Sequence, residues 1–199
     1  SGAKCTSIFP RGMYKSEEVI YEHNINKAKE LLKESGYNPS KDIFEITVSE
    51  GHKDSDEDVI TNIIKDLEIV GIKSEKVYVP KAKLLTNEGL RKGDIIVANW
   101  AADTGGLDNF VQALFNMNTS YFKTGYLNEN VMELMQEARK VVNPKKRMAL
   151  YDEINEKILE DAPILFIANI KSALIYNNRL KDLRISTLDR FIFDEIALK

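Results

Sequence analysis

The chain has 199 residues, of which 43% are hydrophobic and 30% charged, a composition typical of a soluble globular domain with its own core. Lys and Arg number 28 against 31 Asp and Glu, and the basic residues are spread along the chain, so nothing indicates a nucleic-acid partner. No apolar run approaches the ~18 residues of a membrane span. The single cysteine, Cys5, excludes an internal disulfide and a multi-cysteine metal site, and we interpret it as a bystander.

The first half of the chain predicts a strand, a helix and a second strand in succession. Residues 43–49 alternate apolar and polar side chains, and residues 72–79 read as the second strand. Between them, the capping-box pattern of residues 55–58 opens a helix that Gly71 closes. The apolar stripe of this helix consists of Ile60, Ile63, Ile64, Leu67 and Val70. This order predicts a βαβ unit with a right-handed crossover.

Two shorter helices are expected on either side of this unit. Asn24 or Asn26 is suited to cap the earlier one, which stops at Gly36. Pro80 suits the first turn of the later one, which is expected to extend through Leu85.

The second half predicts a strand followed by three helices. Residues 94–100 read as a buried strand and residues 101–106 as a turn-rich stretch. Asn128 and Asn143 are each suited to cap a helix, the second of which Pro163 ends. The apolar positions of the three helices are Phe110, Val111, Leu114 and Phe115; Val131, Leu134, Met135, Ala138 and Val142; and Met148, Tyr151, Ile154 and Ile158.

The end of the chain predicts little regular structure. Residues 164–168 and 173–176 read as strands, whereas residues 177–199 show little amphipathic order. Alternating strands and helices over the whole chain make the fold class α/β.

Sequence patterns of catalytic and metal sites are missing or incomplete. There is no glycine-rich nucleotide loop, no HExxH and no GxSxG, and His23 and His52 are each isolated. The acidic residues 54–58 begin like a calcium loop, but Val59 and Lys65 stand where that loop needs glycine and glutamate. Acidic residues favourable at a helix N-terminus are a sufficient explanation.

A row of carboxylates on one helix is the remaining candidate for acid–base chemistry. Glu129, Glu133 and Glu137 recur every four residues, which we interpret as a solvated helix face. The sequence therefore predicts no catalytic residue, no metal site and no cofactor, and leaves an unrelated small α/β enzyme as an alternative.

Four stretches, in matching order and spacing, carry a family resemblance. Residues 26–37 (NKAKELLKESGY) are similar to the pattern KAKxLLxEAGY, and residues 66–73 (DLEIVGIK) to xLxxxGIxV. Residues 93–103 begin with Gly-Asp and end with Trp-Ala-Ala-Asp, and residues 147–163 are similar to RxxLYxEIxxxxxEDAP. Together, over about residues 20–170, they resemble the dipeptide- and oligopeptide-binding proteins of ABC importers, solute-binding protein family 5.

The resemblance implies one lobe of a type II periplasmic-binding-protein fold, with a mixed sheet flanked by helices. It implies that the protein is not an enzyme but binds a peptide or another small solute and delivers it to the membrane permease of an ABC importer. The implied location is extracytoplasmic, in the periplasm or at the cell surface as a lipoprotein, with the signal outside this chain. Nickel chelates or oligosaccharides are alternative ligands, and the sensor domain of a transcription regulator is an alternative role.

The resemblance also implies a ligand site at Trp100, Ala101 and Asp103, just after a predicted strand, where open α/β sheets bind ligands. In peptide-binding members the motif's aspartate takes the peptide's α-ammonium group, and Asp103 holds that position. Trp100 would supply an apolar wall and Ala101 backbone groups for a peptide bound as an added strand. From the residues alone, Trp100 also reads as core and Asp103 as a turn residue beside Gly105. The family's Asp-Pro after this loop is replaced by Leu107-Asp108.

The same resemblance suggests a division of the chain. Residues 1–170 correspond to the second, C-terminal lobe of a two-lobe protein, and residues 171–199 to a segment that crosses back to an N-terminal first lobe missing from this chain. We therefore expect the chain to hold half of a binding cleft. The crossing segment is expected to pack less well than the rest, because its apolar side chains need cover from water: Leu174, Ile175, Leu188, Phe191, Ile192 and Phe193.

Overall fold

A computed structural model describes residues 2–16, 21–49, 57–90, 92–118, 120–170, 174–186, 190–193 and 196–198. The chain divides into two compact units. We call Glu22–Trp100 the sheet unit, and Ser1–Tyr21 together with Ala101–Lys199 the helical unit. Among the described helices, none combines the length and the apolar composition that crossing a membrane requires.

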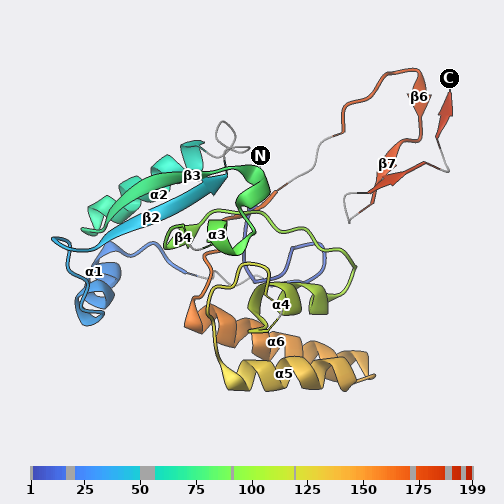
Figure 1. Ribbon diagram of the computed structural model, residues 1–199. Coiled ribbons are helices and arrows are strands. Elements are labelled where there is room, and N and C mark those ends of the chain that lie inside the picture. The colour runs from blue at the N-terminus through green and yellow to red at the C-terminus, as the bar shows by residue number, and fades with distance from the viewer. Residues whose placement is uncertain are drawn as a thin grey trace. The chain divides into compact units, whose positions relative to one another are not determined.

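The sheet unit is built on a parallel three-stranded sheet. Its strands β2 (Ile43–Ser49), β3 (Lys73–Val79) and β4 (Ile95–Ile96) lie in the order β3-β2-β4. Strand β2 pairs with β3 along its whole length, from Ile43 opposite Lys73 to Ser49 opposite Val79. Helix α2 (Glu57–Ile69) connects these two strands (Figure 1), which confirms the predicted parallel βαβ arrangement.

The helix boundaries of this unit follow from local capping. The side chain of Asn24 accepts a hydrogen bond from the backbone N–H of Lys27 at 2.9 Å and begins α1 (Ile25–Glu34), so Asn24 rather than Asn26 is the cap. Gly36 (φ +76°) and Gly71 (φ +92°) follow α1 and α2 in the left-handed region, which favours glycine. Of the predicted capping box, Ser55 and Asp56 lie outside the described residues.

The core of the sheet unit forms between α2 and one face of β2. Ile46, Val48 and Ile60 are fully buried, and partly buried side chains surround them: Ile63, Ile64, Leu67, Ile95 and Val97. On the opposite face of β2, Thr47 and Ser49 are buried as well. The central strand of a parallel sheet is commonly covered on both sides, so its polar side chains are buried along with its apolar ones.

The sequence predicted the segment after β3 less well. The expected strand 94–100 pairs with β2 only at Ile95 and Ile96, because β4 meets just two residues of its neighbour. As the outer strand among those described, β4 is half-buried rather than buried. The expected helix after Pro80 is a single 3-10 turn, η2 (Lys81–Lys83), followed by the unpredicted α3 (Asn87–Leu90).

The helical unit contains α4 (Leu107–Phe115), α5 (Glu129–Lys140) and α6 (Pro144–Asp161). Helices α5 and α6 lie side by side in opposite directions, joined by a short connection (Figure 1). The predicted caps are confirmed, since the Asn128 side chain accepts from the N–H of Val131 and that of Asn143 from the N–H of Lys145. Ala162 adopts φ +48° and ends α6 just before Pro163.

Phe9 lies in the core of the helical unit. Its ring is fully buried and meets Phe110 and Tyr151 edge-on, with ring centroids 6.4 and 5.9 Å away. Two predicted core positions are wrong: Val142 lies beyond the end of α5 with 88% of its surface exposed, and Met148 is also exposed. The other predicted positions are buried, namely Phe110, Val111, Leu114, Phe115, Val131, Leu134, Met135, Ala138, Tyr151, Ile154 and Ile158.

The N-terminal segment, whose sequence shows no helix or strand period, packs along helix α6. The backbone N–H of Ile8 donates to Asn155 Oδ1 at 3.0 Å, and the Tyr14 hydroxyl donates to Asp152 Oδ1 at 2.6 Å. The Tyr21 hydroxyl donates to the carbonyl of the helix's Leu159. Residues from the start of the chain therefore complete a core that α4, α5 and α6 begin.

Antiparallel pairs in the helical unit form sheets of their own. β1 (Gly2–Lys4) pairs with β5 (Ala168–Ile170), β6 (Leu180–Lys181) with β9 (Ala197–Leu198), and β7 (Arg184–Ile185) with β8 (Phe191–Ile192). The α/β class is confirmed, although parallel and antiparallel pairing occur in separate sheets of the described chain. The strand expected at 164–168 begins only at Ala168, and residues 174–176 form no strand; Ala173 is outside the described residues.

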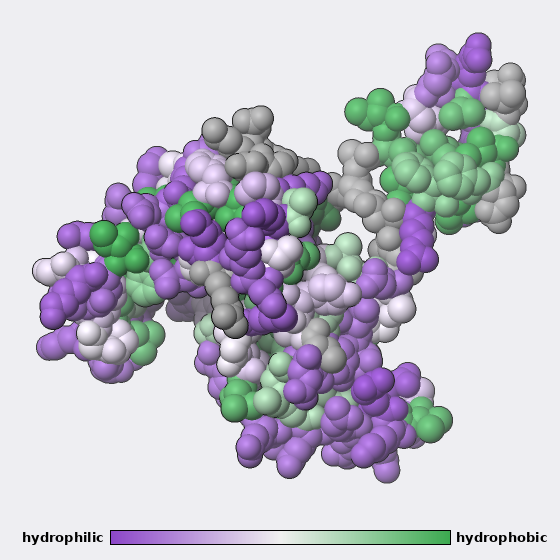
Figure 2. Space-filling model, viewed as in Figure 1, coloured by the Kyte–Doolittle hydropathy of each residue, from purple (hydrophilic) through white to green (hydrophobic). Residues whose placement is uncertain are grey.

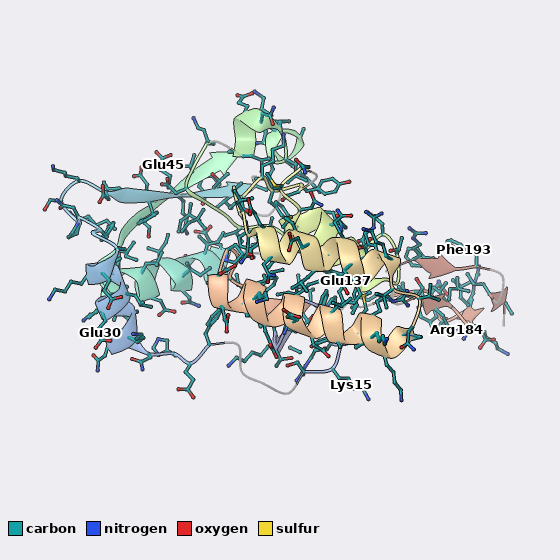
Figure 3. The ribbon with its side chains drawn as sticks, turned by 90° about the horizontal axis from the view of Figure 1, so that it is seen from below. Lys15, Glu30, Glu45, Glu137, Arg184 and Phe193 are labelled. Carbon is teal, nitrogen blue, oxygen red and sulfur yellow. The ribbon has the colours of Figure 1, made fainter. Side chains whose placement is uncertain are left out.

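The C-terminal segment carries exposed apolar side chains (Figures 2 and 3). Ile175 is 96% exposed, and Phe191 and Phe193 are exposed as well, with their rings in contact at a centroid distance of 5.7 Å. Leu174 and Ile192 are half-buried, and Leu188 lies outside the described residues. The described side chains thus pack less well than those of the helices, as predicted.

Candidate ligand-binding site

The candidate site lies in the loop that leaves strand β4. Because β2, β3 and β4 are parallel, their carboxyl ends share one edge of the sheet, and β3 and β4 lie on opposite sides of β2. Open α/β sheets bind ligands at this kind of edge. The last sheet-like bond runs from the N–H of Val97 to the carbonyl of Thr47 at 3.2 Å. Trp100 therefore does not end a strand, and the irregular loop from residue 98 to Gly106 is longer than predicted.

The three predicted ligand residues fall on both sides of the division between the units. Trp100 is half-buried and is the last residue of the sheet unit. Ala101 and Asp103 are exposed and belong to the helical unit, where they open the segment that leads into α4. The helical unit therefore brings Ala101 and Asp103 together, and Trp100 adjoins them in sequence.

Two hydrogen bonds hold the backbone of Asp103. Its N–H donates to Asn109 Oδ1 at 3.1 Å, and its carbonyl accepts from Arg190 Nη2 at 3.2 Å. None of the side chains that the structure describes pairs with its carboxylate. The peptide groups of Asp103 are thus fixed, while its side chain is exposed.

Asp103 begins a bend of the chain at residues 103–106, but among the described residues its carboxylate does not form an Asx turn. In an Asx turn the carboxylate accepts a backbone N–H two residues further on, and within the described part of the chain no such bond occurs. A side chain at Gly105 would meet no atom within 4 Å, and one at Gly106 would meet only Thr104 Oγ1, at 3.9 Å. The loop is therefore open to a ligand on the side of its glycines.

Sequence reasoning did not identify the two residues that hold Asp103. Asn109 sits in the first turn of α4, where a polar side chain next to a loop was a usable signal. Arg190 lies 87 residues away along the chain, and no spacing pattern links it to the loop. Both residues hydrogen-bond to backbone groups of Asp103, and a motif made of side-chain types gives no sign of such bonds.

Two aromatic residues in or near the family motifs hold the fold together. The Tyr37 hydroxyl donates to the carbonyl of Asp42 at 2.9 Å and accepts from the N–H of Lys73 at 3.0 Å, which ties the end of α1 to β3. The Tyr126 hydroxyl donates to Asp161 Oδ2 at 2.6 Å. This bond lowers the pKa of Asp161, whereas burial, followed by the same bond, raises the pKa of Tyr126.

The remaining titratable side chains that the structure describes form no second candidate site. Glu129, Glu133 and Glu137 are exposed along α5, in agreement with a solvated face (Figure 3). His23 is exposed, whereas His52 lies outside the described residues, as do Asp54 and Asp56 of the acidic run. Within the described ranges, no group of three or more His, Cys, Asp or Glu side chains is placed to hold a metal ion. An open hollow in the sheet unit, lined by Ser35, Gly36, Tyr37, Lys41, Asp42, Ile43, Phe44 and Asp94, includes none of the candidate residues.

Known proteins resemble this chain in sequence and in structure. The chain is 26% identical over 106 residues to the peptide transport periplasmic protein SapA of Haemophilus influenzae, a match covering 52% of this chain and 19% of SapA. The periplasmic binding protein DppA of Helicobacter pylori, solved with the peptide STSA, superposes with a TM-score of 0.75 and 27% identity over 84% of this chain and 33% of its own. HbpA2 of Haemophilus parasuis shares the fold, with a TM-score of 0.78 and 24% identity over 100% of this chain and 40% of its own.

The chain thus spans about a fifth of SapA and between a third and two fifths of the two solved proteins. A family model described as "Bacterial extracellular solute-binding proteins, family 5 Middle" matches residues 2–122. That match covers more than half of the chain and includes the loop with Trp100, Ala101 and Asp103. The chain therefore belongs to the bacterial extracellular solute-binding proteins, family 5.

Proposed function

We propose that this chain forms one wall of the peptide-binding cleft in an extracytoplasmic binding protein of an ABC importer. Family membership supports solute binding, and SapA and DppA, by their names and the bound STSA peptide, support peptide as the solute class. In this proposal residues 1–170 are the second lobe and residues 171–199 cross to a first lobe. The protein captures solute outside the cytoplasm and passes it to a membrane permease.

The observation that carries the proposal is the state of Asp103. Its carboxylate is exposed, unpaired among the described side chains, and attached to a backbone that Asn109 and Arg190 hold on both sides. A carboxylate that meets a peptide's α-ammonium group in a closed cleft makes a charge-assisted hydrogen bond, worth about 1.5–3 kcal/mol net. In the proposed site Trp100 supplies an apolar wall and Ala101 contributes backbone groups to a peptide bound as an added strand.

Peptide binding by the two-lobe protein, measured by calorimetry, tests the proposal. Asp103→Asn keeps the shape of the side chain but removes the charge, so the ammonium group is desolvated without a counter-charge. We expect a loss of about 2–5 kcal/mol, or roughly 30- to 5,000-fold in affinity, for peptides with a free N-terminus. The matched control is Asp66→Asn, which makes the same change at an exposed position on α2 and should leave affinity unchanged.

N-acetylated peptides separate a ligand role of Asp103 from a structural one. They should bind poorly to the unmutated protein, and Asp103→Asn should change their affinity very little. Equal losses for free and acetylated peptides would mean that Asp103 only shapes its loop. Trp100→Phe should cost less than Asp103→Asn, because much of the apolar contact survives.

The alternative ligands belong in the same titration. A nickel–histidine chelate and an oligosaccharide mixture are titrated under the same conditions as the peptides. Binding of either one without binding of peptides would overturn the peptide assignment while leaving the family assignment intact.

A further inference from the structure

A second residue, far from the loop in sequence, controls the position of Asp103. The carbonyl of Asp103 accepts a hydrogen bond from Arg190 Nη2 at 3.2 Å. A charged donor makes a stronger bond to a carbonyl than a neutral donor does. Asn109 holds the N–H of the same residue at 3.1 Å, so both peptide groups of Asp103 are occupied.

Arg190 is well placed to hold the loop, because its own backbone is fixed. The N–H of Ser186 donates to the carbonyl of Arg190 at 2.8 Å, and the N–H of Arg190 donates to Ser186 Oγ at 3.2 Å. These bonds close the hairpin of β7 and β8, whose strands pair Arg184 with Ile192 and Ile185 with Phe191. The guanidinium therefore extends from a backbone position that these hydrogen bonds anchor.

The loop itself has little other support. Residues 98–106 form neither helix nor strand, Asp103 is exposed, and a side chain added at Gly105 would meet no atom within 4 Å. Backbone segments of this kind sample many conformations unless side chains tie them down. The bonds from Asn109 and Arg190 are the two described contacts that fix the residue proposed to bind the ligand.

We propose that Arg190 is a positioning residue of the binding site, which holds the Asp103 carbonyl so that the carboxylate is presented to the ligand's ammonium group. This inference rests on the proposed function, since it assigns Arg190 to the same site. It also assigns a role to the C-terminal hairpin, which holds the ligand loop although the two are far apart in the sequence. Lysine has no planar fork and a single nitrogen, so it replaces arginine only in part.

The test compares three variants. Arg190→Ala removes the donor, Arg190→Lys keeps a cation with one donor nitrogen, and Arg179→Ala removes an exposed arginine of the same segment as the control. The first measurement is hydrogen exchange of the Asp103 amide, followed by NMR in this 199-residue chain. The second is the affinity of the two-lobe protein for a pool of di- to pentapeptides, with free and with acetylated N-termini.

Arg190→Ala should speed exchange of the Asp103 amide and weaken binding of the free peptides, each by about three- to tenfold. Arg190→Lys should recover part of both effects, and Arg179→Ala should change neither. Acetylated peptides should not respond to Arg190→Ala, because the residue it positions acts on the ammonium group. A merely structural role of Arg190 would weaken both kinds of peptide equally.

Unchanged exchange and affinity in Arg190→Ala would overturn the inference, as would equal effects of Arg190→Ala and Arg179→Ala. If the unmutated two-lobe protein binds no peptide in either form, the proposed function fails, and with it the role of Arg190 in ligand binding. The exchange comparison then still decides whether Arg190 holds the loop. The two failures are therefore distinguishable.

Discussion

Asp94 brackets Glu45 with two hydrogen bonds of opposite direction. The N–H of Asp94 donates to the carbonyl of Glu45 at 2.8 Å, and the carboxylate Oδ2 of Asp94 accepts from the N–H of Glu45 at 2.9 Å. A side chain on the preceding Gly93 would lie 2.6 Å from that same carbonyl oxygen and 2.6 Å from Thr47 Oγ1. The Gly-Asp of the family motif thus fixes the register of β4 against β2, and with it the start of the loop that contains Asp103.

Gly93→Ala should destabilise the protein. The methyl group of alanine would overlap backbone atoms of Glu45, which cannot move without breaking their hydrogen bonds to Asp94. We expect this overlap to lower the free energy of unfolding by about 1–3 kcal/mol. Gly12→Ala is the control, because an added side chain there meets no atom within 4 Å. Urea unfolding followed by circular dichroism measures both. Equal midpoints for the two variants would contradict the close approach at Gly93.

Asn155→Leu should destabilise the helical unit. The buried side chain of Asn155 accepts the backbone N–H of Ile8 at 3.0 Å, and leucine leaves that N–H buried without a partner. The expected cost is about 1–3 kcal/mol of unfolding free energy. Asn130→Leu makes the same replacement at an exposed position of α5 and should stay within about 0.5 kcal/mol of the unmutated protein. If Asn155→Leu proves neutral, the N-terminal segment is not anchored on α6 through this bond.

Tyr126→Phe should raise the pKa of Asp161 towards its ordinary value of 3.8, because the Tyr126 hydroxyl is the main cause of its lowered pKa. A carboxylate whose pKa is lowered by folding stabilises the folded state above its unfolded pKa, and that contribution is lost as the pH falls through the folded pKa. Tyr126→Phe should therefore make stability less dependent on pH below about pH 4. Carbon-13 NMR titration of the Asp161 carboxyl group measures the shift directly.

Tyr176→Phe is the control for that titration, since Tyr176 is an exposed tyrosine of the C-terminal segment. An unchanged Asp161 titration in Tyr126→Phe would show that Asn128, the second donor to Asp161, is sufficient. At alkaline pH the dependence of stability on pH has the opposite sign, because the pKa of Tyr126 is raised by folding rather than lowered. The raised pKa of Tyr126 means that its contribution is present below about pH 10 and is lost as the pH rises further.

This chain by itself should bind peptides weakly or not at all. In the proposed two-lobe protein the other wall of the cleft comes from the first lobe, and a ligand on one wall stays solvated on its other side. Calorimetry with the pool of di- to pentapeptides should give no binding in the micromolar range. Micromolar or tighter binding would contradict the assignment of residues 1–170 to a single lobe.

The described residues between 174 and 198 should exchange their backbone amides faster than strand β2. Their strands are two residues long, and Ile175, Phe191 and Phe193 are exposed, whereas β2 pairs along both edges and is buried from Ile46 to Ser49. Native-state hydrogen exchange on a verified monomer measures the difference. Protection equal to that of Ile46 would place the lobe boundary elsewhere.

Local signals account for the elements that were predicted well. Asn24, Asn128 and Asn143 satisfy orphan N–H groups at helix starts, and glycines with positive φ end α1 and α2, so these boundaries follow from two or three residues each. The prediction that the apolar face of α5 includes Val142 is wrong. The periodicity of the sequence does not show that the backbone already leaves the helix at Val141, with ψ 117°.

Features that depend on distant partners were not predicted. Residues 94–100 read as a long strand, but the strand observed is set by the two residues of β2 that it meets, which the sequence does not reveal. Asp103 was predicted as a ligand residue through a family motif, whereas its partners Asn109 and Arg190 were not predicted, because they bind its backbone. The role of Phe9 in the core was missed because its partners lie on α4 and α6.

The anchoring of Ile8 on Asn155 determines when the helical unit is able to fold during synthesis. The two residues are 147 positions apart, so at 5–20 residues per second the ribosome needs roughly 7–30 s to deliver the partner of Ile8. Within that interval the sheet unit, Glu22–Trp100, is completed in one continuous stretch. Ile8 and Phe9 therefore lack their partners Asn155 and Tyr151 until α6 has been synthesised.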